Sequence, residues 1–107
     1  MKPIKGNKKI EALFRSGKRC SSIFFHCIFE LDDSTESGYV VSVPKKNFSR
    51  AVDRNKVKRL VREVLRKNAD VFGDVGTGKF MFIYSSNMIA SFLDIEKDFK
   101  SLLKNFF

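Results

Sequence analysis

The segment 52–67 constrains the fold more than any other, because its apolar residues recur with the period of a helix. They occupy positions i, i+3, i+4, i+7 and i+8 and form one stripe: Val57, Leu60, Val61, Val64 and Leu65. Asp53 is a suitable N-cap for this helix. A stripe of Val and Leu is stable only when a core covers it. The segment therefore predicts a helix that is packed on one side and exposed to water on the others.

Two further helices are expected at the two ends of the chain. Residues 8–15 place apolar side chains at i, i+3 and i+4, and Gly17 can end a short amphipathic helix there. Ser91 and Asp94 resemble a capping box that opens the last helix. That helix is expected to bury one apolar face: Phe92, Ile95, Phe99, Leu102, Leu103 and Phe106.

Two neighbouring segments have the aromatic and β-branched composition of strands. Residues 22–31 and 38–43 are expected to pair as a hairpin through a turn at 32–38. Pro44 should end regular pairing on the second strand, since proline cannot donate to a sheet ladder. Residues 45–50 then form a polar connector to the long helix.

A third strand is expected near the end of the chain, and it completes the order of elements. A glycine-containing loop at 73–78 leads to this strand at 79–85. The order is α-β-β-(β)-α-β-α, in which the bracketed strand is optional. A chain of 107 residues is long enough for one core and too short for two. We therefore expect one α+β domain that spans residues 1–107.

The strand at 22–31 has two different faces. One face is apolar and is assigned to the core: Ile23, Phe25, Cys27, Phe29 and Leu31. The other face is mixed: Phe24, His26, Ile28 and Glu30. Beside Phe14 of the first helix, this mixed face could present flat surfaces to unstacked bases, worth roughly 1–3 kcal/mol per base. Packing of Phe14 and Phe24 beneath a helix explains the pattern equally well.

The two cysteines, Cys20 and Cys27, are seven residues apart within or beside the same expected strand. An odd spacing on a regular strand places them on opposite faces. No metal-ligand spacing surrounds them. We therefore expect two reduced structural thiols.

The charge of the chain is concentrated in two segments. The net charge is +9, of which residues 1–19 contribute +6 and residues 45–67 contribute +8, whereas residues 20–44 contribute −4. Such clusters predict an anionic partner, either nucleic acid or an acidic membrane. No segment approaches the roughly 20 apolar residues of a membrane span. Because no apolar signal core follows the first residues, we expect a cytoplasmic protein without a membrane partner.

The cations of the segment 52–67 break two local rules of helix stability. Arg54, Lys58 and Arg62 follow one another at i, i+4 and i+8, where like charges repel by a few tenths of a kcal/mol. Arg54 and Lys56 also stand in the first turn, where the helix dipole disfavours cations. Phosphates would relieve both penalties, and the free N–H groups of that turn could join in binding them. The pattern favours a nucleic-acid surface over an ordinary solvated face.

No catalytic or metal-binding residue is assigned to this chain. Residues 73–79 match the start of a phosphate-binding P-loop, but Phe80 stands where a Ser or Thr hydroxyl is needed. A helix is expected before this segment and a strand after it, which reverses the order of a true P-loop. His26 is the only histidine, and neither a catalytic triad nor a ligand cluster can be assembled around it.

Two segments together resemble the signature of the bacterial ribonuclease P protein family. They are SVPKK at 42–46 and AVDRNKVKRLVRE at 51–63, against a family pattern of approximately VSKK, a short loop and AVxRNRxKRxxRE. Leu13-Phe14 and Gly17-Lys18-Arg19 upstream agree with it. The sequence departs from the pattern at Pro44, at Lys56, which replaces an arginine, and in a connector that is one residue longer.

The resemblance implies a fold and a division of labour. The fold is an α/β sandwich with an unusual left-handed crossover around the basic helix. The RNA subunit of such an enzyme holds Mg²⁺ and hydrolyses the bond between the 5′ leader and precursor tRNA, and the protein assists as a non-catalytic subunit. The residues expected to bind the catalytic RNA are Lys45, Lys46, Arg50, Arg54, Asn55, Lys56, Lys58, Arg59 and Arg62. The residues expected to line a cleft for the leader are Phe14, His26 and Ile28, with Phe24 added from the mixed strand face.

Two other classes of protein share part of this pattern. A structural RNA-binding protein, such as a ribosomal component, has the same charge distribution without a role in cleavage. A DNA-binding regulator could use residues 52–67 as a recognition helix, but it would usually need a helix-turn-helix partner. Strands precede this helix instead, so RNA rather than DNA is the expected partner.

Overall fold

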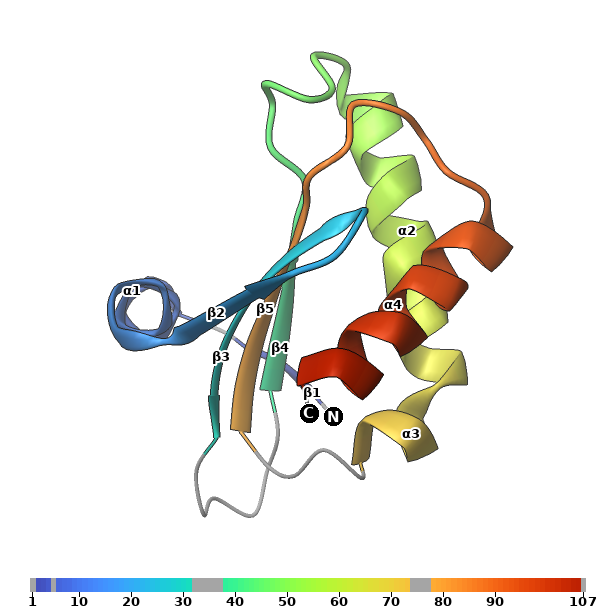
Figure 1. Cartoon of the computed structure of the whole chain (residues 1–107). Coiled ribbons are helices and arrows are strands. Elements are labelled where there is room, and N and C mark those ends of the chain that lie inside the picture. Colours follow the sequence, from blue (N-terminus) through green and yellow to red (C-terminus); the bar gives the residue numbers. More distant parts are fainter. Residues whose placement is uncertain (1, 5, 32–37, 74–77, 107) are drawn as a thin grey trace.

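Within the residues that the structure describes, five strands form one mixed sheet and helices cover both of its faces (Figure 1). The computed structural model describes residues 2–4, 6–31, 38–73 and 78–106. The strands are β1 (Lys2–Pro3), β2 (Lys18–Ser21), β3 (Phe25–Leu31), β4 (Gly38–Ser42) and β5 (Gly78–Tyr84). The helices are α1 (Asn7–Ser16), α2 (Ala51–Lys67), α3 (Ala69–Gly73) and α4 (Phe92–Phe106).

The two faces of the sheet carry different helices, α1 on one side and α2 with α4 on the other (Figure 1). The core between the sheet and the pair α2–α4 is largely aromatic. The rings of Phe82 and Phe99 meet edge to face with their centroids 5.6 Å apart, and Phe25 and Phe99 are 6.4 Å apart. Edge-to-face contacts add to the free energy of burying the rings. The expected α+β sandwich is therefore confirmed, and phenylalanine supplies most of its centre.

The expected hairpin between the second and third of these strands is wrong. The sheet order is β1-β4-β5-β3-β2, so β5 lies between β3 and β4 and pairs with both. Consecutive strands usually pair, which is why the sequence favoured a hairpin. Here α2 carries the chain back along the sheet, and β5 then inserts in parallel beside β4. The chain rises in β4, descends in α2 and rises again in β5, which makes the left-handed crossover of the expected family (Figure 1).

The hairpin of this fold is formed instead by β2 and β3. The expected strand at 22–31 is broken by a tight turn, in which the Ser22 N–H donates to the Phe25 carbonyl at 2.8 Å. The turn leaves Ile23 79% exposed, and Leu31 at the other end of β3 is 50% exposed, so the apolar face assigned to the core is buried only over Phe25–Phe29. The turn expected at 32–38 and the glycines at 74–77 fall largely outside the described residues.

The cysteines do not lie on opposite faces. Cys20 of β2 stands directly opposite Cys27 of β3, and both are buried free thiols. A hydrogen bond to Cys20, together with burial, raises the pKa of Cys27. The expectation of opposite faces failed because it treated both residues as part of a single strand.

On the other face of the sheet, α1 packs closely over β3. Leu13 and Ile28 are both almost completely buried there. Gly17 ends α1 with a φ of −70°, so it is not needed for a left-handed turn. It is needed for closeness, because a Cβ at this position would lie 2.7 Å from a methyl carbon of Ile28 and 2.6 Å from the Leu13 carbonyl oxygen. A larger residue would push the helix away from the sheet.

The last helix begins and packs as expected. The Asp94 N–H donates to Ser91 Oγ at 3.2 Å, which is the predicted cap. Ile95, Phe99, Leu102 and Leu103 are buried and Phe92 is partly buried, whereas the Phe106 side chain lies outside the described part of the chain. α3, β1 and β2 were not expected from the sequence because each spans only five residues or fewer.

A buried carboxylate fastens the β2–β3 turn to α4. Asp98 is only 6% exposed and accepts three hydrogen bonds from the turn. The donors are Ser22 Oγ at 2.7 Å, the Ile23 N–H at 3.1 Å and the Phe24 N–H at 2.9 Å. A buried charge is tolerated when hydrogen bonds replace its water. Asp98 therefore connects the edge of the sheet to the far helix.

We expect Asp98→Ala to lower the free energy of unfolding by about 3 kcal/mol, because two backbone donors and a hydroxyl lose their acceptor. Chemical denaturation followed by circular dichroism measures the change. Asp94→Ala removes an exposed carboxylate from the same helix and should cost less than about 1 kcal/mol. Equal losses in the two variants would show that Asp98 does not anchor the turn.

Candidate nucleic-acid interface

The burial of one stripe fixes which side chains of α2 face water. Val57, Val61, Val64 and Leu65 are buried and Leu60 is partly buried against the core, as the sequence predicted. The opposite side of the helix exposes a set of polar and cationic residues: Asn55, Lys56, Arg59, Arg62, Arg66 and Lys67. Arg54 and Lys58 are half-buried. The core thus holds one row of cations in water.

The start of α2 differs from the sequence prediction. The helix begins at Ala51 with Arg50 as its N-cap residue, and no side chain caps it. Asp53 was expected as the N-cap but lies within the first turn. Its carboxylate there opposes the positive end of the helix dipole. The first-turn cations Arg54 and Lys56 thus remain next to this positive end.

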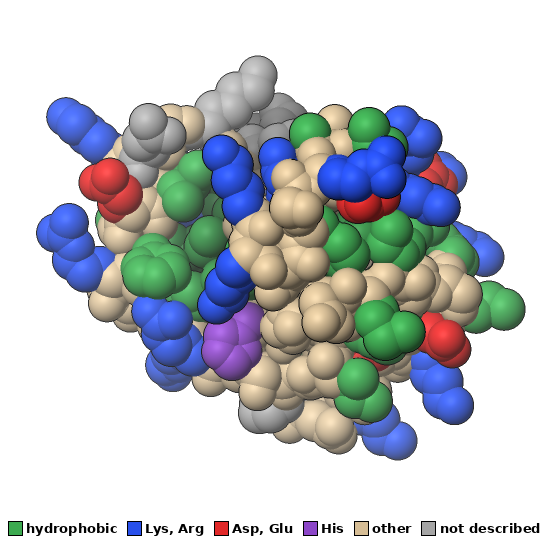
Figure 2. All heavy atoms as spheres, turned by 90° about the horizontal axis from the view of Figure 1, so that it is seen from above, with side chains coloured by type: hydrophobic (Ala, Val, Ile, Leu, Met, Phe, Trp, Pro, Cys, Tyr) green, Lys and Arg blue, Asp and Glu red, His purple; other side chains and the backbone are tan. Residues whose placement is uncertain are grey.

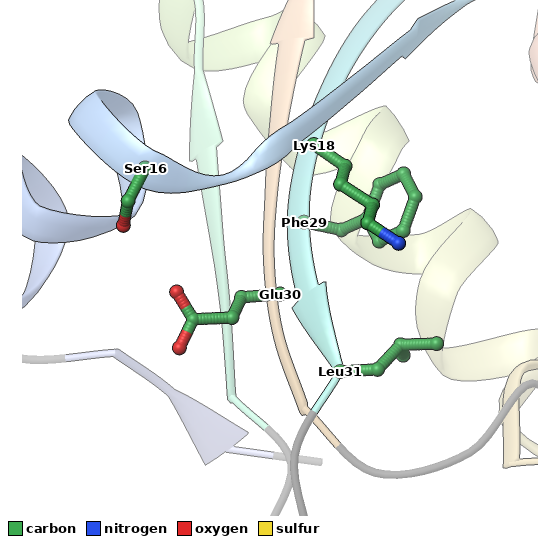
Figure 3. Close-up of a pocket in the computed structure, with 5 residues that line it drawn as sticks. All are labelled: Ser16, Lys18, Phe29, Glu30 and Leu31. Carbon is green, nitrogen blue, oxygen red and sulfur yellow. The ribbon is translucent and has the colours of Figure 1, made fainter.

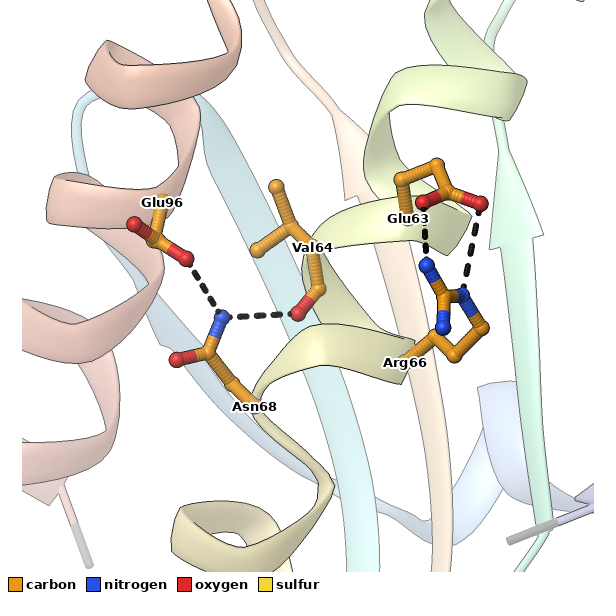
Figure 4. Close-up of polar contacts among 5 residues, drawn as sticks. All are labelled: Glu63, Val64, Arg66, Asn68 and Glu96. Carbon is orange, nitrogen blue, oxygen red and sulfur yellow. Dashed lines mark hydrogen bonds and ion pairs between the residues drawn. The ribbon is translucent and has the colours of Figure 1, made fainter.

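Two cations at the end of α2 are engaged inside the fold. Arg66 Nη2 lies 2.8 Å from Glu63 Oε2, and the guanidinium of Arg66 lowers the pKa of Glu63 (Figure 4). Lys67 Nζ lies 5.3 Å from the centre of the Phe92 ring on α4. Asn68 follows, and its side-chain amide donates to the Val64 carbonyl and to Glu96 of α4 (Figure 4). This end of the helix is therefore tied to the protein itself.

The cations nearer the start of α2 are different. In the described part of the chain, Lys56, Lys58, Arg59 and Arg62 form no ion pair with a carboxylate. Unpaired cations side by side repel one another, and an external polyanion would remove that repulsion. The arrangement supports the part of the predicted RNA-binding set that these residues represent.

The connector 45–50 is a built turn rather than a loose link. The Asn47 N–H donates to the Pro44 carbonyl at 3.1 Å, and Asn47 Nδ2 donates to the Tyr84 carbonyl at 3.0 Å. Phe48 is buried, with its ring 6.1 Å from that of Tyr84. Lys45, Lys46 and Arg50 are exposed on this turn. The anchoring role of Phe48 was missed, although one aromatic residue in a polar segment could have indicated it.

Tyr84 also fixes the loop that follows β5. Its hydroxyl donates to the Met88 carbonyl at 2.8 Å and accepts from the Ala90 N–H at 3.2 Å. Burial raises the pKa of Tyr84, so this hydroxyl keeps its proton at neutral pH. The connector and the loop 85–91 are therefore both attached to one buried tyrosine. Figure 2 looks down on this end of the molecule and shows Lys and Arg side chains there together with the single histidine.

The open face of the sheet supplies a second candidate surface. Phe14 is 50% exposed at the edge of α1, and Arg19 lies over its ring with a guanidinium carbon 4.9 Å from the centroid. His26 is exposed on β3, with Ser21 and Ile83 as its cross-strand partners. Arg19 and Ile83 were not predicted site residues. The register of β2 and β5 against β3 brings them to this face, and the sequence alone does not define that register.

Two residues predicted for the leader cleft lie elsewhere. Ile28 is 0% exposed beneath α1, so it shapes the floor of the sheet and offers no surface to a base. Phe24 is partly buried, and its ring stacks on Tyr84 with the two planes 4° apart. Phe24 therefore belongs to the core, which was the alternative that the sequence left open. Phe14 and His26 remain as exposed candidates.

A shallow pocket of about 250 Å³ opens at the far end of β3 from His26. It is lined by Ser16, Lys18, Phe29, Glu30 and Leu31 (Figure 3). The Glu30 carboxylate at its wall disfavours an anion, so we do not include this pocket in the candidate interface. The described residues contain no group of three or more His, Cys, Asp or Glu placed to hold a metal ion. They also contain no helix long and apolar enough to span a membrane.

The fold and this surface define a small α+β protein built around a cationic crossover helix, and the comparisons with known proteins identify its family. The sequence model of the Ribonuclease P family matches residues 2–106. The ribonuclease P protein component of Porphyromonas gingivalis is 34% identical over 97 residues, which cover 88% of this chain and 69% of that protein. This chain therefore belongs to the family of the ribonuclease P protein component.

Other relatives agree with this assignment. The component of Nitrosococcus oceani is 41% identical over 61 residues, and the match spans 57% of this chain and about half (51%) of that relative's length. The solved RNase P protein of Staphylococcus aureus superposes with a TM-score of 0.81 at 22% identity, covering 96% of this chain and 93% of that one. The Thermotoga maritima protein gives a TM-score of 0.80 at 22% identity, with coverage of 98% and 97%. At this identity the two structures establish the fold.

Exposure and burial on α2 predict opposite effects for neighbouring substitutions. We expect Arg59→Ala to leave the free energy of unfolding within about 0.5 kcal/mol of wild type, because exposed substitutions rarely cost more. The same variant should weaken RNA binding. Leu65→Ala should cost about 2–5 kcal/mol of stability, since this side chain is buried. Denaturation and RNA titration of both variants measure these effects, and the reverse outcome would mean that the helix is rotated.

Proposed function

We propose that this protein is the RNA-binding subunit of ribonuclease P and that it assists removal of the 5′ leader from precursor tRNA. In this proposal the catalytic RNA subunit carries out the hydrolysis and holds most of the Mg²⁺. The protein acts in the cytoplasm, where precursor tRNA is made. The observation that carries the proposal is the row of unpaired cations on α2, in a chain that belongs to this family.

The proposed contact with the catalytic RNA uses α2 and the connector before it. Lys56, Lys58, Arg59 and Arg62 would meet phosphate oxygens along the RNA backbone. Arginine can offer two parallel N–H donors to a phosphate, whereas lysine acts as a point charge. Lys56 thus replaces a planar donor of the family pattern with a compact one. Asn55 beside these cations would add neutral donors and acceptors.

The proposed contact with the leader uses the open face of the sheet. Phe14 gives a half-exposed ring whose far face is covered by the Arg19 guanidinium. A base could stack on the free side of this ring, while Arg19 also neutralises a nearby phosphate. His26 lies at the end of β3 nearest the connector, on the same face of the sheet as Ile28 and Ile83. The leader would then run across a surface that is apolar at its centre and cationic at its edge.

The proposed mechanism is electrostatic and positional. Two RNA molecules repel each other through their phosphates, and a protein with cations on two surfaces lowers that repulsion. By holding the leader on one surface and the catalytic RNA on another, the protein would place the cleavage site near the bound Mg²⁺. Such positioning favours productive substrate binding without a protein group in the chemical step.

The proposal predicts a stimulation of cleavage that depends on salt. The protein, reconstituted with its cognate RNA at low magnesium, should increase the rate of precursor-tRNA cleavage over that of RNA alone. Its affinity for the RNA should fall by about 10³–10⁵ between 50 and 200 mM salt if 6–10 phosphates are contacted. A gel-based cleavage assay and filter binding measure the two effects. Absence of stimulation, or equal competition by duplex DNA, would contradict the proposal.

The leader surface predicts a selective loss of substrate binding. Phe14→Ala should weaken binding of leader-bearing precursor to the reconstituted complex by about 5- to 150-fold, since base stacking contributes roughly 1–3 kcal/mol. Binding of a leaderless tRNA should not change. Leu31→Ala removes an apolar side chain of equal exposure at the far end of β3 and serves as the control. Equal effects on the two substrates would show that Phe14 does not contact the leader.

A further inference from the structure

We infer that Arg54 acts on RNA binding through the connector 45–50 rather than by its own contact with RNA. In this inference Arg54 is a positioning residue that holds the exposed cations Lys45 and Lys46 in place. The inference rests on the proposed function, because it concerns the same RNA interface. It separates one arginine of the predicted RNA-binding set from its neighbours on α2.

The hydrogen bonds of Arg54 differ from those of the other cations near the start of α2. Its Nη1 donates to the Phe48 carbonyl at 2.9 Å and to the Ser49 carbonyl at 3.0 Å. The side chain is half-buried against the connector, whereas Arg59 and Arg62 on the same helix are exposed. A guanidinium nitrogen that already serves two carbonyl oxygens has its donors directed toward the protein. Arg54 is therefore bound within the fold before RNA arrives.

Arg54 completes a set of three attachments that give the connector one shape. Asn47 Nδ2 holds it to the Tyr84 carbonyl, and the Phe48 ring is buried against Tyr84. Arg54 adds the bonds that reach the second half of the turn. Between these attachments, Lys45 and Lys46 stand exposed without a carboxylate partner among the described residues. Fixing a cationic loop in advance removes an ordering cost from its binding to RNA.

The two possible roles of Arg54 predict different responses to salt. Each phosphate contact lowers the slope of log K against log salt by about 0.9 for a duplex and about 0.7 for a single strand. An arginine that only touches one phosphate should remove one such contact when it is replaced. An arginine that positions two other cations should remove more than one contact. The slope therefore counts contacts that a loss of affinity alone does not separate.

The test is a double-mutant cycle in the full-length protein with its cognate RNA. Arg54→Met keeps the aliphatic stem and removes the donors, and Lys45→Gln/Lys46→Gln removes the connector cations. Arg62→Met is the matched control on the exposed side of α2. Binding is measured as a function of salt for each variant and for each combination. Amide hydrogen exchange of free Arg54→Met is compared with that of wild type, so that one result does not depend on RNA.

The inference predicts strong coupling between Arg54 and the connector. Arg54→Met should weaken binding and reduce the salt slope by more than one contact. Adding Lys45→Gln/Lys46→Gln to Arg54→Met should cost at least threefold less affinity than adding it to wild type. The Arg62→Met combination should be additive within about twofold, as expected for independent sites. In the free protein, exchange of the Asn47 amide should be faster in Arg54→Met, and exchange in β3 and β5 should be unchanged.

Two results would overturn the inference, and they differ from failure of the proposed function. Additive effects, with a slope reduced by one contact as in Arg62→Met, would make Arg54 a direct phosphate contact and leave the proposed function intact. An unchanged Asn47 exchange rate would show that Arg54 does not order the connector. If instead Arg54→Met and Arg62→Met both bind RNA like wild type, the proposed interface and the inference fail together.

Discussion

The burial of the Val and Leu stripe of α2 is the interaction on which the rest of this structure depends. Val57, Val61 and Val64 are almost completely covered by the sheet and α4, and this fixes the rotation of the helix about its axis. Without that rotation the cations would have no common direction. The hydrophobic effect is non-directional, but an amphipathic helix converts it into a defined orientation of charged groups. Packing on one side of α2 thus determines the electrostatics of the other.

The charged residues of the chain fall into those used by the fold and those left for a partner. Glu63–Arg66, Lys67 on Phe92, and Asp98 with the β2–β3 turn all connect elements of the protein. The cations between Lys56 and Arg62 make no such connection within the described residues. A polyanion is the partner that completes their interactions. The distinction could not be made from net charge alone, because both groups contribute equally to the value of +9.

The sequence defined local features well and long-range pairing poorly. The apolar stripe of α2 and the Ser91 cap were both predictable, because helix periodicity and capping depend on residues within one or two turns. The β3–β4 hairpin was wrong because pairing depends on which strand returns to the middle of the sheet. Ile28 was misassigned for a related reason, since its burial comes from α1 and Gly17 rather than from its own strand. The two hydrogen bonds of Arg54 were likewise invisible without the path of the connector.

The central place of β5 has a consequence for the order in which the molecule is made. β3 and β4 do not pair with each other, so neither can complete its hydrogen bonds until residues 78–84 are available. On a ribosome, the first three-quarters of the chain would emerge with open strand edges and with the basic helix still lacking its full core. Long-range pairing of this kind slows folding and leaves unpaired edges exposed for longer. Synthesis of the last thirty or so residues therefore sets the moment at which the nascent chain can close its sheet, an order-of-magnitude count that follows from the position of β5.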